Sequence, residues 1–215
     1  MELLATSQVT RAARIIEGGG LVVVPTARWY MICCDAGNSE ACARIYQAKR
    51  RPLAKSLLLV LPQTLAAKEY FLIDEATERL MRHLWPGDLA LRLRWASGEF
   101  GARYAAVGDK VALVGQPAGI LGELATECSA HIAATSANIS GTPTSPDEGP
   151  SISIPEVTAF AETASVPIDA LIDGGLCPQF LHMTIVDCAT TNKPPRIERE
   201  GTTHRRAVET ALRWG

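Results

Sequence analysis

The feature that most constrains this sequence is a series of short, unbroken apolar runs, each preceded by a segment of helical periodicity. The run at 21–24 follows a helical stripe at 10–17 and three glycines, and Pro25 ends it. A strand that is covered on both faces forms a continuous apolar run, because neither of its faces meets water. We therefore expect 21–24 to be a buried strand in a sheet that carries helices.

The same order recurs along the chain. Further helices are predicted over 39–48, 75–84 and 120–127, and further strands over 57–61, 89–93, 111–114 and 131–134. The alternation predicts an α/β fold with a twisted mixed sheet covered by helices. The length of 215 residues predicts one domain over 1–215. The serine-, threonine- and proline-rich segment 141–155 is expected to be an exposed loop, either a lid or a linker.

Composition excludes several classes of protein. With 47% hydrophobic and 20% charged residues, the chain can bury a core and is not intrinsically disordered. A net charge of −2 and a pI near 6.1 argue against a dedicated nucleic-acid binder. No apolar stretch is long enough for a membrane helix, and the start lacks the basic and apolar regions of a signal peptide. A cytoplasmic location with no membrane association is expected.

The six cysteines show neither a Cys-x-x-Cys pair nor the Cys/His spacing of a zinc site. Buried thiols are expected, and no protein metal site is predicted. The four histidines, His182 among them, are scattered and are expected to be structural or on the surface.

One cluster of cations stands between a predicted helix and a predicted strand. Lys49, Arg50, Arg51 and Lys55 place four positive charges within seven positions. Such a cluster suits a polyphosphate, which needs several fixed counter-charges. A charge run of this kind is also common on a solvated surface, so both interpretations stay open.

A second candidate segment follows the predicted strand at 131–134. There, Thr135, Ser136 and Asn138 stand among small residues that let a ligand approach the backbone. α/β folds bind ligands just beyond the ends of their strands. The alternative is a polar turn whose side chains cap a helix.

Together the two clusters resemble the YrdC-like family of threonylcarbamoyl-AMP synthases. The resemblance rests on Lys49-x-Arg51-Pro52-Leu53-x-Lys55 and on Ala-Ala-Thr-Ser-Ala-Asn-Ile-Ser-Gly at 133–141. Further matching segments, in the same order along the chain, are Leu84-Trp85-Pro86-Gly87, Asp173-Gly174-Gly175, Thr184-Ile185-Val186-Asp187 and Ile197-x-Arg199-Glu200-Gly201.

The resemblance implies a YrdC-like twisted mixed sheet with flanking helices around an open cavity. It implies a nucleotidyltransferase that joins L-threonine, bicarbonate and ATP into threonylcarbamoyl-AMP and releases pyrophosphate. A separate transferase would then use the product for tRNA N6-threonylcarbamoyladenosine formation. Mg²⁺ would bind mainly to phosphate oxygens and water, which is why no carboxylate cluster is needed.

The resemblance also assigns residues. Lys49 and Arg51 would be the catalytic pair, since the reaction needs alignment and charge stabilisation rather than a triad. The residues expected to bind ATP are Lys49, Arg51, Lys55, Ser136, Asn138 and Arg199. Those expected to bind the amino-acid substrate are Thr26, Arg28, Tyr30 and Thr135.

The segments that border the substrate side depart from the family pattern. The family motif Pro-Thr-x-Thr-x-Tyr-Gly-Leu has Arg28 and Met31 at its second threonine and its glycine, and Val-Arg-x-Pro has Gly115 for arginine. Trp-Pro-Gly-Pro-Leu-Thr-Leu has become Trp-Pro-Gly-Asp-Leu-Ala-Leu at 85–91, and the serine before Thr-Ile-Val-Asp is Met183.

Three hypotheses follow from these departures. Arg28 can supply, from another wall, the guanidinium that Gly115 lacks. Alternatively, the chain forms a carbamoyl-type adenylate from a different amine. Loss of catalysis, leaving a noncatalytic nucleotide- or RNA-binding module, is disfavoured because Lys49, Arg51, Ser136 and Asn138 are all retained.

Overall fold

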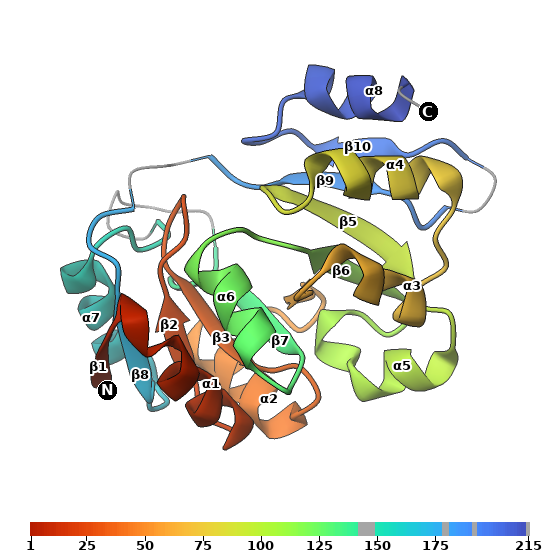
Figure 1. Ribbon diagram of the computed structural model, residues 1–215. Helices are drawn as coiled ribbons and strands as arrows, with labels where there is room; N and C mark the ends of the chain where they lie inside the picture. Colours follow the sequence, from red (N-terminus) through yellow and green to blue (C-terminus); the bar gives the residue numbers. More distant parts are fainter. Residues whose placement is uncertain (142–148, 178–180, 191–192, 214–215) are drawn as a thin grey trace.

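The computed structural model describes residues 1–141, 149–177, 181–190 and 193–213 (Figure 1). Within this part, the helices are α1 (Val9–Glu17), α2 (Ser39–Ala48), α3 (Ala67–Tyr70), α4 (Glu75–Leu84), α5 (Gly98–Arg103), α6 (Ile120–Glu127), α7 (Ile154–Thr163) and α8 (Arg205–Arg213). The strands are β1 (Glu2–Ala5), β2 (Val22–Val24), β3 (Met31–Asp35), β4 (Leu58–Val60), β5 (Leu89–Arg94), β6 (Val111–Gly115), β7 (Ile132–Ser136), β8 (Ala170–Asp173), β9 (Thr184–Asp187) and β10 (Arg196–Arg199).

The predicted α/β class and twisted mixed sheet are confirmed. The strands form one sheet in the order β1-β8-β2-β3-β7-β4-β6-β5-β9-β10, with parallel and antiparallel neighbours. Each predicted helix and strand is present to within a few residues.

The core lies on both faces of the sheet. On one face, apolar side chains of α1 and α6 pack on β2, β3, β7 and β8, and Figure 1 shows these two helices side by side in front of the strands. On the other face, α2, α4, α7 and α8 contribute the apolar side chains. The part of the first face that α1 and α6 leave uncovered is where the candidate site lies.

The predicted loop at 141–155 is only partly tested. Residues 142–148 lie outside the described part of the chain, so the lid interpretation stays a prediction. The end of the prediction is wrong, because α7 already begins at Ile154. Pro155 stands at the first turn of this helix, where its missing N–H costs nothing.

The described residues bear on three further expectations. None of the helices among them is long and apolar enough to cross a membrane. Five of the six cysteines are buried and Cys188 is half-buried, as expected for structural thiols. In the same part of the chain, no group of three or more His, Cys, Asp or Glu side chains is placed to hold a metal ion.

Candidate active site

A cavity of about 500 Å³ opens on the sheet face that α1 and α6 do not cover. Its floor comes from six neighbouring strands of the sheet, β3, β7, β4, β6, β5 and β9. Its rim comes from the loops that follow α2 and β7. Among its described lining residues there is no carboxylate, and the cations are Arg28, Lys49, Arg51, Lys55, Arg92 and Arg199. A cavity of this size fits a small ligand, and its lining favours an anion.

Lys49 reaches the site because of how α2 ends. Arg50 adopts a left-handed backbone with φ of 49°, and the Arg51 N–H donates to Tyr46 O at 2.9 Å. This reversal ends the helix and leaves Arg50 exposed outside the cavity lining, while the Lys49 side chain is 1% exposed. Of the predicted four-cation cluster, three members therefore meet at the cavity.

The Lys49 ammonium holds the turn after β7. Its Nζ donates to Ser136 O, to Asn138 O at 2.6 Å and to Asn138 Oδ1 at 3.1 Å. Burial and, to a lesser extent, the neighbouring Arg51 charge lower the pKa of Lys49 to about 7. The structure thus brings together two segments that lie far apart in the sequence.

The turn itself is a compact polar cradle. Ser136 Oγ donates to Asn138 Oδ1 at 2.6 Å, and the Ser140 N–H donates to Lys49 O at 2.7 Å. The buried Ser140 Oγ has no hydrogen-bond partner among the described residues, although it lines the cavity. An unpaired buried hydroxyl is costly, so a ligand oxygen here would be stabilising.

Arg51 and Lys55 stand on the loop between α2 and β4. Arg51 donates from Nε to Lys55 O at 3.0 Å and from Nη2 to Ser56 O at 2.8 Å. These bonds fix the loop, and burial lowers the pKa of Arg51. Lys55 is exposed and lines the cavity, and its role as a phosphate ligand stays a prediction.

The opposite wall carries Arg199 and Arg92. Arg199 donates to Met183 O from Nε at 3.2 Å and from Nη2 at 3.1 Å. Its pKa is lowered by burial and then by the charge of Arg92. Arg92 is paired with Glu198 at 2.6 Å, so Arg199 is the less compensated of the two cations.

Arg28 closes the third wall. It stands in the turn between β2 and β3 and forms an ion pair with Asp88, which directly precedes β5. The strands β7, β4 and β6 separate β3 from β5 in the sheet, so this contact requires a concave sheet. A second contact across the same gap joins the rings of Trp29 and His182, 5.0 Å apart and edge to face.

The environment of Arg28 is unusual for a cation. Its side chain is 2% exposed, and its Nε has no hydrogen-bond partner among the described residues. Burial, followed by the charge of Arg199, lowers its pKa to about 10. Arg28 therefore does not point into bulk solvent. An orientation into solvent would have excluded the relocated-guanidinium hypothesis, so this hypothesis stays open as a prediction.

The other residues expected to bind substrate are divided. Thr135 lines the cavity, whereas Thr26 and Tyr30 are not among its lining residues. Thr26 Oγ1 donates to Trp29 O at 2.7 Å, and Tyr30 OH donates to Gly175 O at 2.8 Å. The structure thus places Thr26 and Tyr30 where they shape the hairpin that carries Arg28.

The sequence did not assign a role to several residues of the site. His182, Ser140 and Arg92 line the cavity, and Asp88 pairs with Arg28. A signal for the pair was present, because the chain gains an arginine at 28 and an aspartate at 88 relative to the same family pattern. For His182 and Arg92 no local pattern was available.

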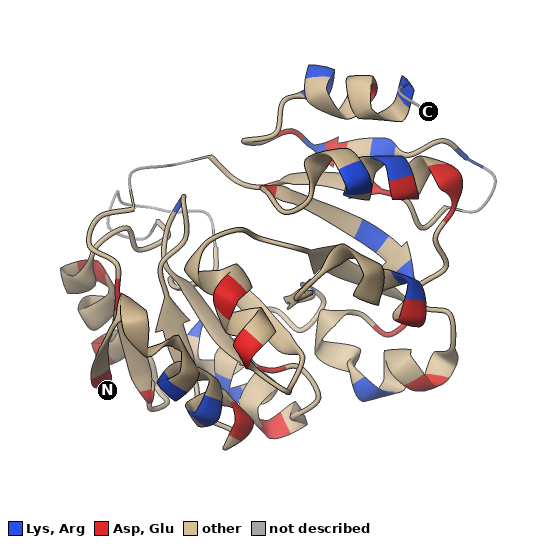
Figure 2. Ribbon diagram, in the orientation of Figure 1, with Lys and Arg blue, Asp and Glu red and all other residues tan. Residues whose placement is uncertain are grey.

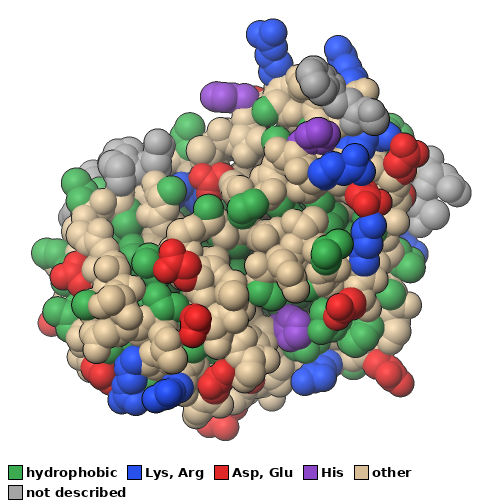
Figure 3. All heavy atoms as spheres, viewed as in Figure 1, with side chains coloured by type: hydrophobic (Ala, Val, Ile, Leu, Met, Phe, Trp, Pro, Cys, Tyr) green, Lys and Arg blue, Asp and Glu red, His purple; other side chains and the backbone are tan. Residues whose placement is uncertain are grey.

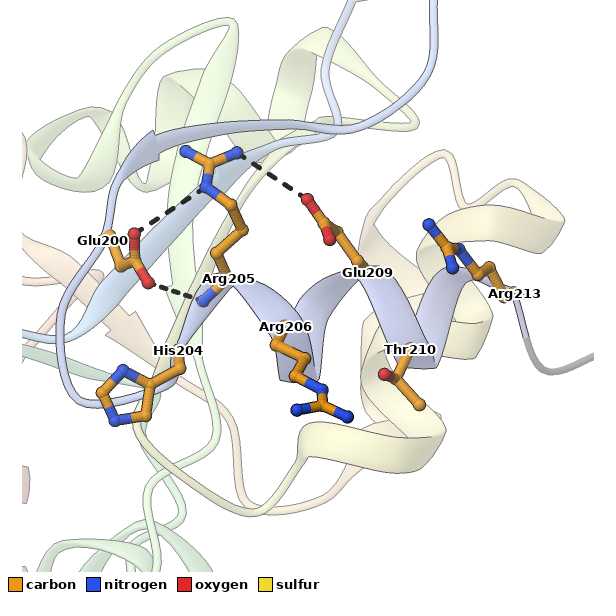
Figure 4. A pocket seen from close by; sticks show the side chains of 7 residues that line it. All are labelled: Glu200, His204, Arg205, Arg206, Glu209, Thr210 and Arg213. Atoms are coloured by element: carbon orange, nitrogen blue, oxygen red, sulfur yellow. Dashed lines mark hydrogen bonds and ion pairs between the residues drawn. The ribbon is translucent and has the colours of Figure 1, made fainter.

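A larger hollow of about 660 Å³ lies at the C-terminal helix (Figure 4). Its lining comes from 200–213, a single segment of chain. Figure 4 shows Arg205 between two carboxylates, Glu200 and Glu209, at 3.8 and 4.0 Å. The charge of Arg205 is compensated, and two carboxylates belong to the lining, so this hollow is a weaker candidate for an anion site than the cavity without carboxylates.

On the side of the molecule that Figures 2 and 3 show, the described cations do not form a continuous basic area. In Figure 2 the Lys and Arg positions on α4 and α8 are accompanied by acidic positions. On the face shown in Figure 3, acidic and basic side chains are interspersed. This distribution does not favour the RNA-binding alternative, which would need several phosphate contacts.

Comparison with known proteins identifies the family. A family model for Sua5, YciO and YrdC proteins, described as "Telomere recombination", matches residues 14–201. The chain belongs to this family. The resemblance noted from the sequence motifs is confirmed.

Curated relatives of the family carry a common name. The threonylcarbamoyl-AMP synthase of Pyrococcus abyssi is 33% identical over 195 residues, which are 88% of this chain and 53% of the relative. That of Bacillus subtilis is 27% identical over 208 residues, which are 95% of this chain and 56% of the relative. The chain thus spans about half the length of the curated relatives it matches.

Solved structures agree with the fold. P. abyssi Sua5 complexed with L-threonine aligns with a TM-score of 0.81 at 28% identity, covering 98% of this chain and 60% of that one. E. coli YciO aligns with a TM-score of 0.75 at 22% identity, covering 94% of this chain and 95% of that one. The second match shows a shared fold.

Proposed function

We propose that this chain is a nucleotidyltransferase that joins an amine, bicarbonate and ATP into a carbamoyl-type adenylate and releases pyrophosphate. L-threonine is the first acceptor to test, because relatives of the family are named threonylcarbamoyl-AMP synthases and one is complexed with L-threonine. With threonine, the adenylate would serve a separate transferase that modifies tRNA.

One observation carries this proposal: the convergence of Lys49, Arg51, Lys55 and the Ser136–Asn138 turn on a cavity lined by cations and free of carboxylates among the described residues. A nucleoside triphosphate carries several negative charges that need fixed counter-charges. The unpartnered Ser140 hydroxyl adds a donor at the same place.

The reaction balances without a protein nucleophile. The neutral amine either attacks carbon dioxide and loses a proton, or attacks bicarbonate with loss of water, and each route gives a carbamate. A carbamate oxygen then attacks the α-phosphorus of ATP, the bond to the bridging oxygen breaks, and pyrophosphate leaves with the electron pair. The contributions proposed for this chain are alignment and stabilisation of charge on the phosphates by Lys49, Arg51 and Arg199.

Magnesium fits this site only as a companion of ATP. Because the described cavity lining offers no carboxylate, an Mg²⁺ ion would take phosphate oxygens and water as its ligands. It would partly neutralise the phosphates when bound.

The test is pyrophosphate release that depends on both bicarbonate and an amino acid, with mass spectrometry of the adenylate formed from ¹³C-bicarbonate. Lys55→Ala is the informative variant, and Arg50→Ala is its matched control. Both are exposed cations of one loop, but only Lys55 lines the cavity.

Losing one charge-assisted contact of about 1.5–3 kcal/mol should raise the KM for ATP roughly 10- to 100-fold in Lys55→Ala. Arg50→Ala should leave it unchanged. Equal effects of the two substitutions would overturn the site assignment, and ATP binding without any adenylate for a broad panel of amines would overturn the proposed activity.

A further inference from the structure

The end of the cavity under the Arg28–Asp88 pair differs from the phosphate end. Its floor carries Met31 from β3, Ala90 from β5, and Met183 and Ile185 at the start of β9. All four belong to one apolar cluster. A ligand part that lies here meets methyl and methylene groups and no hydroxyl or amide from these strands.

This apolar end is next to the phosphate end. Met31 pairs in register with Ser136, whose hydroxyl belongs to the polar turn that Lys49 holds. On the other side, Ala90 pairs with Gly115 and with Ile185. A group bonded to the α-phosphate at the turn would therefore lie next to Met31. The ion pair between Arg28 and Asp88 brings the start of β5, which carries Ala90, to the same end of the concave sheet.

Three departures from the family pattern lie at or next to this end, since Ala90 and Met183 line the cavity and Gly115 pairs with Ala90. Gly115 replaces an arginine, Met183 a serine and Ala90 a threonine, so three polar side chains are absent together. A Cβ added at position 115 would meet Leu58 Cδ1 at 3.3 Å and Met183 Cε at 3.4 Å, so apolar side chains surround this position. All three changes make this end of the cavity less polar.

Arg28 is the cation of this end. Its guanidinium lines the cavity and is nearly fully buried, and its Nε has no partner among the described residues. Asp88 pairs with its charge, but the Nε–H still needs an acceptor. A carboxylate on the acceptor amine can take this hydrogen bond, since guanidinium and carboxylate match in geometry.

We propose, on the basis of the carbamoyl-adenylate activity, that the acceptor is an aliphatic α-amino acid rather than a hydroxylated one. Arg28 binds its carboxylate, and its side chain packs on Met31, Ala90 and Met183. Its amine faces the polar turn, where the carbamate meets the α-phosphate.

The decisive comparison is between valine and threonine, which have nearly the same shape and differ by a methyl group in place of a hydroxyl. Bicarbonate-dependent pyrophosphate release is measured with each, and the adenylate is identified by mass. Because an apolar pocket rejects an isosteric hydroxyl by roughly 100-fold, valine should exceed threonine by about that factor in kcat/KM. Threonine equal to or better than valine overturns this inference and leaves the proposed function standing.

Two variants connect the preference to the named residues. Ala90→Thr returns a hydroxyl to the floor and should reduce the preference for valine at least tenfold. Arg28→Met combined with Asp88→Asn removes the guanidinium without leaving Asp88 unpaired. It should raise the KM for valine roughly 100-fold and leave the KM for ATP unchanged.

Isobutylamine, which is valine without its carboxylate, provides the control for Arg28. The unmodified enzyme should use it far less well than valine, whereas the double variant should no longer distinguish the two. Equal use of valine and isobutylamine by the unmodified enzyme overturns the assigned role of Arg28, whether or not the variant folds. If ATP binds but no amine gives an adenylate, the proposed function fails and this inference fails with it.

Discussion

Met183 lies beside Gly115, where an added Cβ would meet Met183 Cε at 3.4 Å and Leu58 Cδ1 at 3.3 Å. Gly115 is the last residue of β6, and Met183 directly precedes β9. The strand β5 lies between β6 and β9 in the sheet. Each departs from the family pattern, and the two positions are close enough for a larger side chain at 115 to compete with Met183 for the same space.

This fit predicts coupling between substitutions. Gly115→Arg should lower the free energy of unfolding by about 2 kcal/mol, because the larger side chain overpacks a filled space. Adding Met183→Ser makes room, so the double variant should be more stable than the sum of the single effects by about 1 kcal/mol. Urea denaturation of the four proteins measures this coupling, and additive effects would contradict the fit.

The Arg28–Asp88 pair predicts a second coupling. Asp88→Asn leaves a guanidinium that is 2% exposed without its counter-charge. Breaking a buried pair costs about 3–5 kcal/mol, and the partial exposure of Asp88 places the expected loss near 3 kcal/mol. Replacing both residues, as Arg28→Met with Asp88→Asn, should cost clearly less.

A double-mutant cycle by denaturation checks this expectation. The losses of unfolding free energy in Arg28→Met, in Asp88→Asn and in the double variant are compared. If the loss in the double variant equals the sum of the two single losses, the ion pair does not hold the hairpin against β5. Because the pair joins two ends of a concave sheet, the single variant should also lose protection from hydrogen exchange in the 25–30 turn.

The sequence predicted five of the described strands, β2, β4, β5, β6 and β7, and it did not predict β1, β3, β8, β9 and β10. Buried strands such as β2 and β4 form continuous apolar runs, because helices or other chain segments cover both faces. The edge strands β1 and β10 are mostly exposed and leave no such pattern. β3 was missed because its two cysteines and terminal aspartate do not form a clear apolar run.

The site was predicted through motifs rather than through spacing. Lys49 and Asn138 meet because α2 ends near the carboxyl end of the central strand β7. This relationship depends on the strand order of the sheet. The contact of Arg28 with Asp88 depends on sheet curvature, which no local periodicity encodes. The one signal for this contact in the sequence was that Arg28 and Asp88 both depart from the family pattern and carry opposite charges.

The backbone at Arg50 gives a prediction about stability alone. A residue with φ of 49° pays for crowding of its Cβ, and glycine does not. Arg50→Gly should therefore raise the free energy of unfolding by about 0.5–1 kcal/mol with no loss of activity, since Arg50 lies outside the cavity lining. Arg14→Gly, an exposed position within α1, should lower it by about 1 kcal/mol. Equal destabilisation by both would contradict the left-handed turn.

The buried ammonium of Lys49 predicts that ATP binding takes up a proton. In the free protein its pKa is lowered to about 7, chiefly by burial, so at pH 8 the group is mostly neutral. Phosphates next to it favour the charged form and raise the pKa in the complex, so binding above pH 7 must draw a proton from solvent. Apparent affinity for ATP should then fall by up to tenfold per pH unit above about pH 7.

Calorimetry at pH 8 in two buffers of different ionisation enthalpy measures the proton uptake, which Lys49→Met should abolish. Proton-neutral binding by the unmodified protein would show that Lys49 does not respond to the phosphates.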